Sequence, residues 1–394
     1  MTMKRAMIAL LAGTALAVPL SACATPPAKP ASIRPVTNKA ALAEGVRVAD
    51  WQLAHMDNFD YVPVSAFRKD TEARRDWIQA TFYIGLAAYA DASGSKRYAD
   101  AIFAHGKAEG WGFDHRPRHA DADATAAVWI WSSAHAHDPS ILIPTRARFD
   151  AVLAAPSTVD LNFDAKPPQG GGPYCQDRWC WSDALFMAPP AWTALSKVSG
   201  DPLYLAHSDA EFWAATDLLF DKEEGLYYRD SRFIARRSDA GAKIFWGRGN
   251  GWAFAGIARI LQDLPANHPS RPKYEAIFKQ MAARIVTLQG QEGYWPVSLL
   301  EPQKTPETSG TGFFVYGLAW GVNHGLLPAA QYRPVIDKGW NALVKAVEPD
   351  GKLGWVQRVG VAPDQVGPDD TQLYGVGAFL LSASEVSRLP VARR

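Results

Sequence analysis

The sequence of 394 residues predicts an all-α protein folded as a closed (α/α)6 barrel, a ring of six helical hairpins with short strands or loops at one end. Two observations predict this fold class. Twelve segments have the apolar spacing of helices, and a motif typical of helix ends recurs at long intervals. The chain shows no strand–helix alternation with Gly-rich phosphate loops, which argues against a doubly wound nucleotide-binding fold.

The apolar spacing is clearest in the second half of the chain. In residues 271–289, Tyr274, Ile277 and Met281 fall on one face of a helix, and residues 330–347 repeat the pattern. By the same criterion we predict twelve helices, over residues 40–56, 73–93, 97–110, 120–137, 143–155, 182–199, 201–217, 250–263, 271–289, 309–323, 330–347 and 370–385.

The recurring motif is an acidic residue, then Gly, then an aromatic segment, and it contains Gly110, Gly225, Gly293 and Gly351. These glycines are 115, 68 and 58 residues apart. If the first interval spans two units, each unit has about sixty residues. We expect each Gly to stop a helix in the left-handed conformation, and the aromatic segment to begin a short strand or loop. Irregular units of this length favour a closed barrel over an open solenoid.

Charge and aromatic content indicate the class of partner. The 41 Lys+Arg and 40 Asp+Glu nearly cancel, whereas a nucleic-acid-binding surface is strongly basic. Part of the 15 Trp, 13 Tyr and 17 Phe forms the core, but Trp and Tyr beside Gly and charged residues also suit a sugar-binding cleft. An oligosaccharide is therefore the expected partner, and nucleic acid is not.

The N-terminus is typical of a secretory signal. Lys4 and Arg5 precede an apolar stretch over residues 6–20, which is too short for a transmembrane helix. The following Leu-Ser-Ala-Cys (20–23) resembles a bacterial lipoprotein signal. We therefore expect Cys23 to carry lipid, and the protein to meet the membrane through this anchor only.

This interpretation divides the chain into three parts. Residues 1–22 are the signal peptide, residues 23–36 a Pro-rich extended tether, and residues 37–390 a single (α/α)6 domain. Ala24 follows the lipidated Cys, whereas an Asp there would indicate retention in the inner membrane. The expected location is the cell envelope, on the periplasmic side of the outer membrane.

The two remaining cysteines, Cys175 and Cys180, are compatible with a disulfide in an oxidising periplasm and equally with two free thiols. No metal site is expected, because the chain has neither a Cys-x-x-Cys pair nor two His at ligand spacing on one helix.

Three dense motifs lie where inner helices are expected to begin, over residues 178–190, 245–253 and 306–313. Each motif has a structural interpretation, with Asp183, Thr308 and Ser309 as helix caps and the Gly pairs as tight turns. Together, however, they bring Trp, Arg and Asn to one end of the barrel. Helix N-termini add positive partial charge there, which suits a carboxylated ligand.

These motifs resemble those of glycoside hydrolase family 105, the unsaturated rhamnogalacturonyl hydrolases, and more distantly family 88, the unsaturated glucuronyl hydrolases. The resemblance runs from about residue 70 to 385. It is carried by Trp-Ser-Asp-Ala-Leu-Phe-Met-Ala-Pro-Pro (181–190), Asp-Lys-Glu-Glu-Gly-Leu-Tyr-Tyr-Arg-Asp (221–230), Phe-Trp-Gly-Arg-Gly-Asn-Gly-Trp (245–252), Glu-Thr-Ser-Gly (307–310) and Leu-Tyr-Gly-Val-Gly-Ala-Phe (373–379).

The resemblance implies an (α/α)6 barrel without metal or organic cofactor, and an uncommon glycosidase. Members act on oligosaccharides from polysaccharide lyases, of the pectin or rhamnogalacturonan type, whose non-reducing end is a 4,5-unsaturated uronic acid. An Asp protonates C4 and assists the addition of water at C5, after which the hemiketal opens and the glycosidic link breaks. The two-carboxylate distance rule of ordinary glycosidases does not apply directly.

The family's acid/base Asp falls on Asp183, and burial among neighbouring aromatic rings is expected to raise its pKa. A second family Asp falls on Asp121. This sequence departs from the family there, because Ala122 and Ala127 stand where relatives often have Asp and Gln. Asp123 is the alternative to Asp121, and Asp121 as a surface helix cap is a third possibility.

The resemblance also implies substrate contacts. Trp246 and Trp252 are expected to stack on the sugar, and Arg248 to bind its carboxylate through paired hydrogen bonds. Arg229 stands where relatives commonly have His, so the role of that position is open. The full set of expected contacts is Trp181, Met187, Arg229, Trp246, Arg248, Trp252, Thr308 and Ser309.

Two other classes of function remain as alternatives. Another (α/α)6 enzyme, such as a sugar epimerase or polysaccharide lyase, usually relies on His or Tyr/Arg bases, and none of the nine His lies in the three dense motifs. A non-catalytic glycan-binding lipoprotein would keep the Trp residues but would not need Asp183. The sequence leaves open galacturonate or glucuronate, the next sugar and the oligomeric state.

Overall fold

The computed structural model describes residues 36–64, 67–163, 174–302 and 305–390, all within the compact unit Arg34–Arg394. The predicted signal peptide, Cys23 and nearly all of the tether lie outside the described residues. The domain boundaries in that part of the chain therefore stay predictions. None of the helices within the described ranges is long and apolar enough to cross a membrane.

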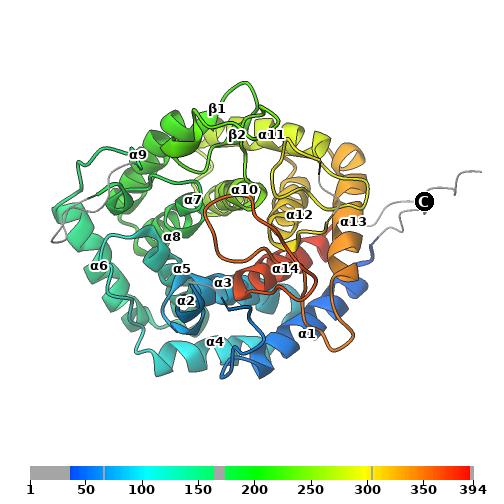
Figure 1. Ribbon diagram of the computed structural model, residues 1–394. Coiled ribbons are helices and arrows are strands. Elements are labelled where there is room, and N and C mark those ends of the chain that lie inside the picture. Colours follow the sequence, from blue (N-terminus) through cyan, green and yellow to red (C-terminus); the bar gives the residue numbers. More distant parts are fainter. Residues whose placement is uncertain (1–35, 65–66, 164–173, 303–304, 391–394) are drawn as a thin grey trace, which may run out of the picture. The chain divides into compact units, whose positions relative to one another are not determined.

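Twelve main helices of the described unit form two concentric rings, as the sequence predicts (Figure 1). The inner ring consists of α3 (Trp77–Ser93), α5 (Ala120–Ala136), α8 (Pro189–Ser199), α10 (Gly247–Asp263), α12 (Thr308–Asn323) and α14 (Leu373–Val386). The outer ring consists of α1 (Asn38–Ala54), α4 (Lys96–Ala108), α6 (Ile143–Ala154), α9 (Pro202–Leu219), α11 (Arg271–Thr287) and α13 (Ala329–Lys345). Each inner helix packs against the next, and α14 packs against α3, which closes the ring.

Burial explains which helices lie inside. Every residue of α12 from Thr308 to Val322 is buried, as is all of α14, because both sequences are apolar or small on every side. In α11 only one face is buried, the one that includes Tyr274, Phe278 and Met281. The amphipathic spacing recognised in residues 271–289 therefore belongs to an outer helix, whereas the inner helices α12 and α14 are buried on every side.

The ring closes through direct backbone contact between its first and last inner helices. Gly85 of α3 lies so close to α14 that an added Cβ would be 2.3 Å from the carbonyl oxygen of Gly377. Likewise, a Cβ on Gly377 would be 2.3 Å from the carbonyl oxygen of Thr81. Only glycine permits this approach at both positions, because any side chain would have to displace backbone atoms.

The helix predicted over residues 182–199 is wrong as one helix, since it consists of α7 (Ala184–Met187) and α8. Pro189 and Pro190 have no N–H, so they cannot continue the hydrogen bonding of α7. The carbonyl of Phe186, which loses its partner at Pro190, instead accepts a 3.0 Å hydrogen bond from Arg259 of α10.

The four glycines of the recurring motif all have positive φ, as expected. Only Gly110 directly follows a helix end, at the C-terminus of α4. Gly225 lies instead in the turn of a hairpin between β1 (Phe220–Asp221) and β2 (Leu226–Tyr227), which pair antiparallel with Phe220 opposite Tyr227. The prediction of a left-handed glycine is confirmed at all four sites. The prediction of a helix stop holds at Gly110 and is wrong at Gly225, Gly293 and Gly351, which lie several residues beyond the preceding helix.

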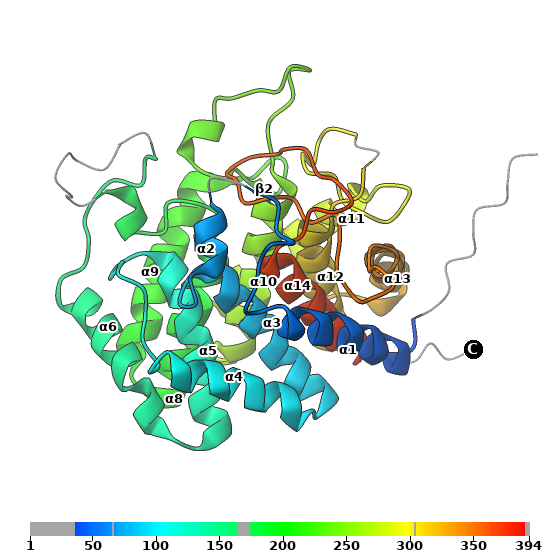
Figure 2. The ribbon, with the colours of Figure 1, turned by 60° about the horizontal axis from the view of Figure 1, so that its bottom comes forward.

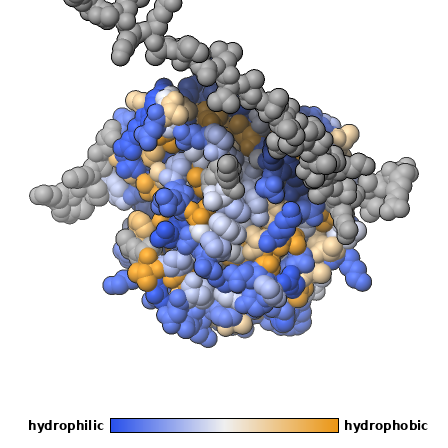
Figure 3. All heavy atoms as spheres, turned by 45° about the vertical axis from the view of Figure 1, so that its right-hand side comes forward, coloured by the Kyte–Doolittle hydropathy of each residue, from blue (hydrophilic) through white to orange (hydrophobic). Residues whose placement is uncertain are grey.

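Long loops precede the inner helices and short turns follow them, so the loops gather at the end where the inner helices begin (Figure 2). They contain the hairpin and the short elements α2 (Arg68–Glu72), η2 (Cys175–Asp177) and η3 (Ser231–Phe233). Apolar periodicity predicts none of these, and only β2 falls where the recurring motif predicts a short strand or loop. At the opposite end, η1 (Pro139–Leu142) leads directly into α6. The face in Figure 3 mixes hydrophilic and hydrophobic residues, as is normal for a protein surface.

The contact between α3 and α14 can be tested with Gly377→Ala. The added methyl group meets backbone of α3, so we expect unfolding free energy to fall by about 1–3 kcal/mol, seen as a lower melting temperature. Gly360→Ala is the control, because its Cβ would lie no closer than 3.8 Å to any neighbour. Equal melting of the two variants would mean that α14 can move away from α3 at little cost.

Candidate active site

A pocket of about 500 Å3 lies at the end of the barrel where the inner helices begin. Residues at the N-terminal ends of α3, α5, α7 and α10 line it, together with loops between outer and inner helices. Helix N-termini directed at one cavity favour a negatively charged ligand. Seven of the predicted site residues line this pocket, namely Asp121, Trp181, Asp183, Met187, Arg229, Trp246 and Arg248.

Asp183 precedes α7, but its side chain forms no capping hydrogen bond with that helix. One carboxylate oxygen accepts a 3.1 Å hydrogen bond from Ser182 and lies 3.6 Å from the Nε of Arg229. Burial raises the pKa of Asp183, and the charge of Asp121 acts in the same direction, while Arg229 and Arg248 oppose it. The carboxyl group thus lines the pocket with a raised pKa, and the alternative of a helix cap is not supported.

Asp121 and Asp123 lie in different surroundings although they are two residues apart. Asp121 lines the pocket, and the cap of α5 is His119, whose ring accepts a hydrogen bond from the Asp121 N–H. Asp123 is buried, with one oxygen 3.0 Å from Arg148 and the other 2.9 Å from the indole N–H of Trp192. The structure therefore favours Asp121 as the second carboxyl group of the pocket and gives Asp123 a structural role.

Arg116 joins three carboxylates at the edge of the pocket. Its guanidinium lies 3.1 Å from Asp76, 2.6 Å from Asp114 and 3.3 Å from Asp121. Burial raises the pKa of both Asp76 and Asp121 to about 6, although Arg116 partly offsets this rise. Sequence analysis missed Arg116 and Asp76, which belong to no recognisable motif. Asp76 also caps α3 through the Trp77 N–H.

Aromatic rings form part of the wall. Trp181 and Trp246 line the pocket although each side chain is almost fully buried, so only ring edges or faces reach the cavity. Trp77, which sequence analysis missed, is more exposed and stacks on Tyr374 with 5.2 Å between ring centroids. Rings placed in this way can contact the apolar faces of a sugar.

Arg248 does not have the free guanidinium that the sequence analysis expects. Its two terminal nitrogens donate hydrogen bonds to the backbone carbonyls of Gln357 and Arg358, at 2.7 and 2.9 Å. The guanidinium also lies over the rings of Trp246 and Tyr374, at 4.4 and 4.8 Å from their centroids. Arg248 lines the pocket, but its paired donors hold the loop between α13 and α14, which passes over the end of the barrel in Figure 1.

Three other residues predicted to contact substrate do not line this pocket. Trp252 is buried and packs against Phe186 and Phe313 within the inner ring. Thr308 donates a 2.9 Å hydrogen bond to the carbonyl of Gly354, and Ser309 bonds to the carboxylate of Glu307. These side chains support the wall from behind. The cap of α12 is Glu307, not Thr308 or Ser309.

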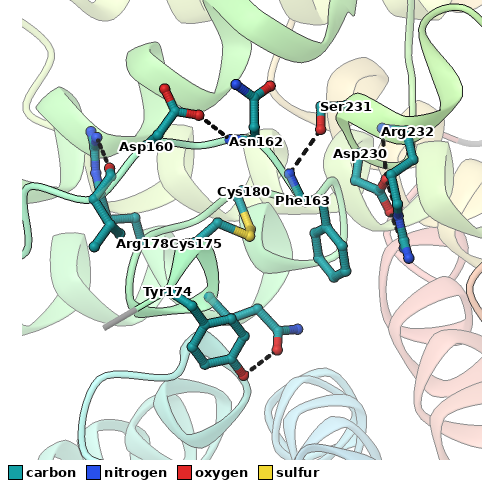
Figure 4. Close-up of a disulfide and its surroundings, with 12 residues drawn as sticks. Asp160, Asn162, Phe163, Tyr174, Cys175, Arg178, Cys180, Asp230, Ser231 and Arg232 are labelled. Atoms are coloured by element: carbon teal, nitrogen blue, oxygen red, sulfur yellow. Dashed lines mark hydrogen bonds and ion pairs between the residues drawn. A yellow bond between two sulfur atoms is a disulfide. The ribbon is translucent and has the colours of Figure 1, made fainter. Parts of the chain in front are cut away.

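The structure joins Cys175 and Cys180 in a disulfide, one of the two states that the sequence leaves open (Figure 4). This disulfide spans the turn that contains Gln176, and Tyr174 immediately precedes it. Tyr174 and Gln176 both line the pocket, and the tyrosine hydroxyl bonds to the Gln176 side chain. The covalent link therefore shapes one side of the pocket.

The described ranges contain no group of three or more His, Cys, Asp or Glu side chains that could hold a metal ion. Two histidines, His115 and His119, line the pocket although none of the dense motifs contains His. Burial lowers the pKa of His119 to about 3, so its ring is neutral at ordinary pH.

The separate roles of the two neighbouring carboxylates can be tested with a matched pair of variants. Asp123→Asn removes the charge that balances buried Arg148, and breaking such a pair costs about 3–5 kcal/mol of stability. Asp121→Asn should melt close to wild type, because burial already raises the pKa of Asp121 to about 6 and its charge is poorly stabilised. We expect Asp121→Asn to lower activity instead. Thermal melting and activity assays of both variants check this assignment. It would be reversed if Asp121→Asn lowered stability and Asp123→Asn instead lowered activity.

Comparisons with known proteins agree with this architecture. A protein of Alteromonas sp. (strain LOR) named unsaturated 3S-rhamnoglycuronyl hydrolase is 46% identical over 349 residues, covering 87% of this chain and 84% of that protein. A solved structure described as a glycosyl hydrolase family 88 protein from Bacteroides vulgatus is 28% identical, with a TM-score of 0.76, covering 90% of this chain and 99% of the other.

A second solved structure, described as a polysaccharide lyase, is 29% identical with a TM-score of 0.77, covering 89% of this chain and 97% of the other. The family described as Glycosyl Hydrolase Family 88 matches residues 46–390, which include the double ring from the middle of α1 onward and every residue that lines the pocket. The chain belongs to Glycosyl Hydrolase Family 88 and is a glycoside hydrolase.

Proposed function

We propose that this hydrolase removes a 4,5-unsaturated uronic acid from the non-reducing end of lyase-generated oligosaccharides by hydrating its C4–C5 double bond. The observation that carries the proposal is the state of Asp183. Its carboxyl group lines the pocket, burial raises its pKa, and it caps no helix. A raised pKa keeps a carboxyl group protonated to higher pH, and in that form it can act as the acid that this reaction requires.

The geometry supports the steps in turn. The helix N-termini around the pocket favour the uronate carboxylate, and the rings of Trp77 and Trp181 can contact the sugar face. Asp183 gives its proton to C4, water adds to C5, and the water returns a proton to the Asp183 carboxylate. The hemiketal formed at C5 then opens to a ketone, which leaves a hemiacetal at C1. This hemiacetal collapses to an aldehyde and releases the rest of the oligosaccharide with a free hydroxyl group.

The next sugar is proposed from the relatives. The name of the Alteromonas protein specifies a rhamnoglycuronyl substrate, so we propose a rhamnose beside the unsaturated uronate. A panel of lyase products tests this choice, with rhamnose or another sugar in the second position, with galacturonate- or glucuronate-derived ends, and with or without sulfate on the rhamnose. Preference for a product without rhamnose would exclude it.

A polysaccharide lyase activity is the second candidate. A solved structure with that description resembles this chain, and neutral His119, Tyr174 and Arg116 stand in the same pocket. The two activities change ultraviolet absorbance in opposite directions. A lyase creates the conjugated carboxylate that absorbs, whereas the proposed hydration destroys it. Rising absorbance on an intact polysaccharide would therefore favour the lyase, and falling absorbance on a lyase digest the hydrolase.

The role of Asp183 can be tested with Asp183→Asn, which keeps the size of the side chain and removes the acid proton. General acid–base catalysis contributes about 10²–10⁴-fold, so we expect kcat to fall at least a hundredfold with little change in melting temperature. The measurement is the decay of ultraviolet absorbance on a lyase digest beside a thermal melt. If the variant keeps more than about a tenth of the wild-type rate, Asp183 is not the general acid. Loss of activity together with loss of the melting transition would favour a structural role.

We also propose that lipid on Cys23 holds the protein in the cell envelope, on the periplasmic side of the outer membrane. The support is the sequence around Leu-Ser-Ala-Cys (20–23) and the apolar stretch before it. Cys23→Ala should move the protein from the membrane fraction to the soluble fraction, as measured by fractionation and immunoblotting. Unchanged sedimentation of the variant would contradict lipidation.

A further inference from the structure

Arg229 is held rigidly beside Asp183. One terminal nitrogen lies 2.7 Å from the carboxylate of Asp230, and the guanidinium carbon is 5.0 Å from the ring centroid of Phe163. The two segments that contain the pair are also joined through their backbones, because the Ser182 N–H donates a 2.8 Å hydrogen bond to the carbonyl of Arg229. The segments that carry Arg229 and Asp183 therefore stay side by side.

Asp230 anchors a second arginine in the same way. Arg232 places two nitrogens 2.8 Å from the Asp230 oxygens and lies 4.1 Å from the centroid of Phe163 (Figure 4). Burial alone would raise the pKa of Asp230, but Arg232 and Arg229 outweigh it and hold the pKa below its usual value. Arg229 and Arg232 thus both pair with Asp230 and both lie over the Phe163 ring. Of these two arginines, only Arg229 lines the pocket.

The Nε–H of Arg229 is a buried donor without an acceptor among the described residues. An Asp183 oxygen lies 3.6 Å from this nitrogen, just beyond hydrogen-bonding distance. A buried unpaired donor is costly, and it gains most when an anion forms beside it. In the proposed reaction, such an anion forms when Asp183 gives its proton to C4.

We propose that Arg229 is a positioning residue for the hydration step, whose Nε–H hydrogen-bonds the Asp183 carboxylate once that group has lost its proton. The inference rests on the proposed function of Asp183. The bond lasts until the attacking water, on joining C5, returns a proton to the carboxylate. No oxidant, reductant or further reactant takes part, and Asp230 and Phe163 keep the guanidinium from turning away.

The charged groups that act on Asp183 come from three other segments, with Arg229 from the loop after β2, Arg248 from α10 and Asp121 from α5. Loss of the positive charge at position 229 removes one of the charges that lower the pKa of Asp183, while burial and the charge of Asp121 still raise it. The pKa of Asp183 then rises further. Because Asp183 must be protonated to donate, activity should persist to higher pH even though the maximum rate is lower.

The experiment compares Arg229→Gln with Arg232→Gln in the full chain, using pH profiles of kcat and KM and a thermal melt. Arg229→Gln should lower kcat about 10- to 100-fold and move the alkaline limit of activity up by about one to three pH units. Arg232→Gln disturbs the same anion and ring, but it should leave the pH limit at the wild-type position. Arg229→Lys keeps the charge and loses the Nε–H, so it should keep the pH limit and lower kcat.

The outcomes separate this proposal from the proposed function. If the wild type is active and Arg229→Gln keeps both its rate and its pH limit, the positioning role is excluded while the function stands. An equal shift in Arg232→Gln would also exclude it, since the effect would then come from the shared anion. Should Arg229→Gln fail to fold, Arg229→Lys decides, because wild-type kcat in that variant overturns the role of Nε. Absence of wild-type activity on every lyase product counts against the proposed function.

Discussion

Backbone-to-backbone packing of the inner helices determines where the pocket lies. Each inner helix contributes its N-terminal end to the same end of the ring, and these ends cannot shift independently once α14 contacts α3 through Gly85 and Gly377. The acidic residues near the starts of α3, α5 and α7 are therefore presented from fixed supports. Rigid helices position catalytic groups more accurately than loops do.

The ring architecture and the helix positions were predictable from sequence because periodicity and glycine spacing are local signals. All twelve predicted segments contain a helix. One helix was predicted over residues 182–199, where the structure has α7 and α8, because apolar spacing continues across Pro189 and Pro190. Asp183, Trp181 and Trp246 could be identified because they lie in dense motifs at helix starts. Asp121 lies outside those motifs and was indicated only by the family resemblance. The motifs indicate which residues lie near the pocket. They do not indicate which of these residues line the cavity and which are buried behind the lining residues.

The sequence could not distinguish residues that line the pocket from residues that are buried behind them. Trp252 lies in the same motif as Trp246 and Arg248, which line the pocket, but the helical turn directs it into the core. Ser309 is also buried, and no residue of its motif (306–313) lines the pocket. Arg248 reaches the pocket, yet most of its hydrogen bonds go to loop carbonyls 109 and 110 residues further along the chain. Arg116 and Asp76 meet only in the folded chain, and no local pattern marks such a pair.

The disulfide beside the pocket has a consequence for how the enzyme depends on its compartment. A cross-link between residues only five apart closes a very short loop, so it contributes little to the stability of the whole chain compared with a long-range cross-link. It constrains instead the turn that presents Tyr174 and Gln176. In a thiol-reducing environment, the barrel would persist while this side of the pocket lost its covalent restraint. Redox conditions during production would then alter the fit of the substrate more than the amount of folded protein.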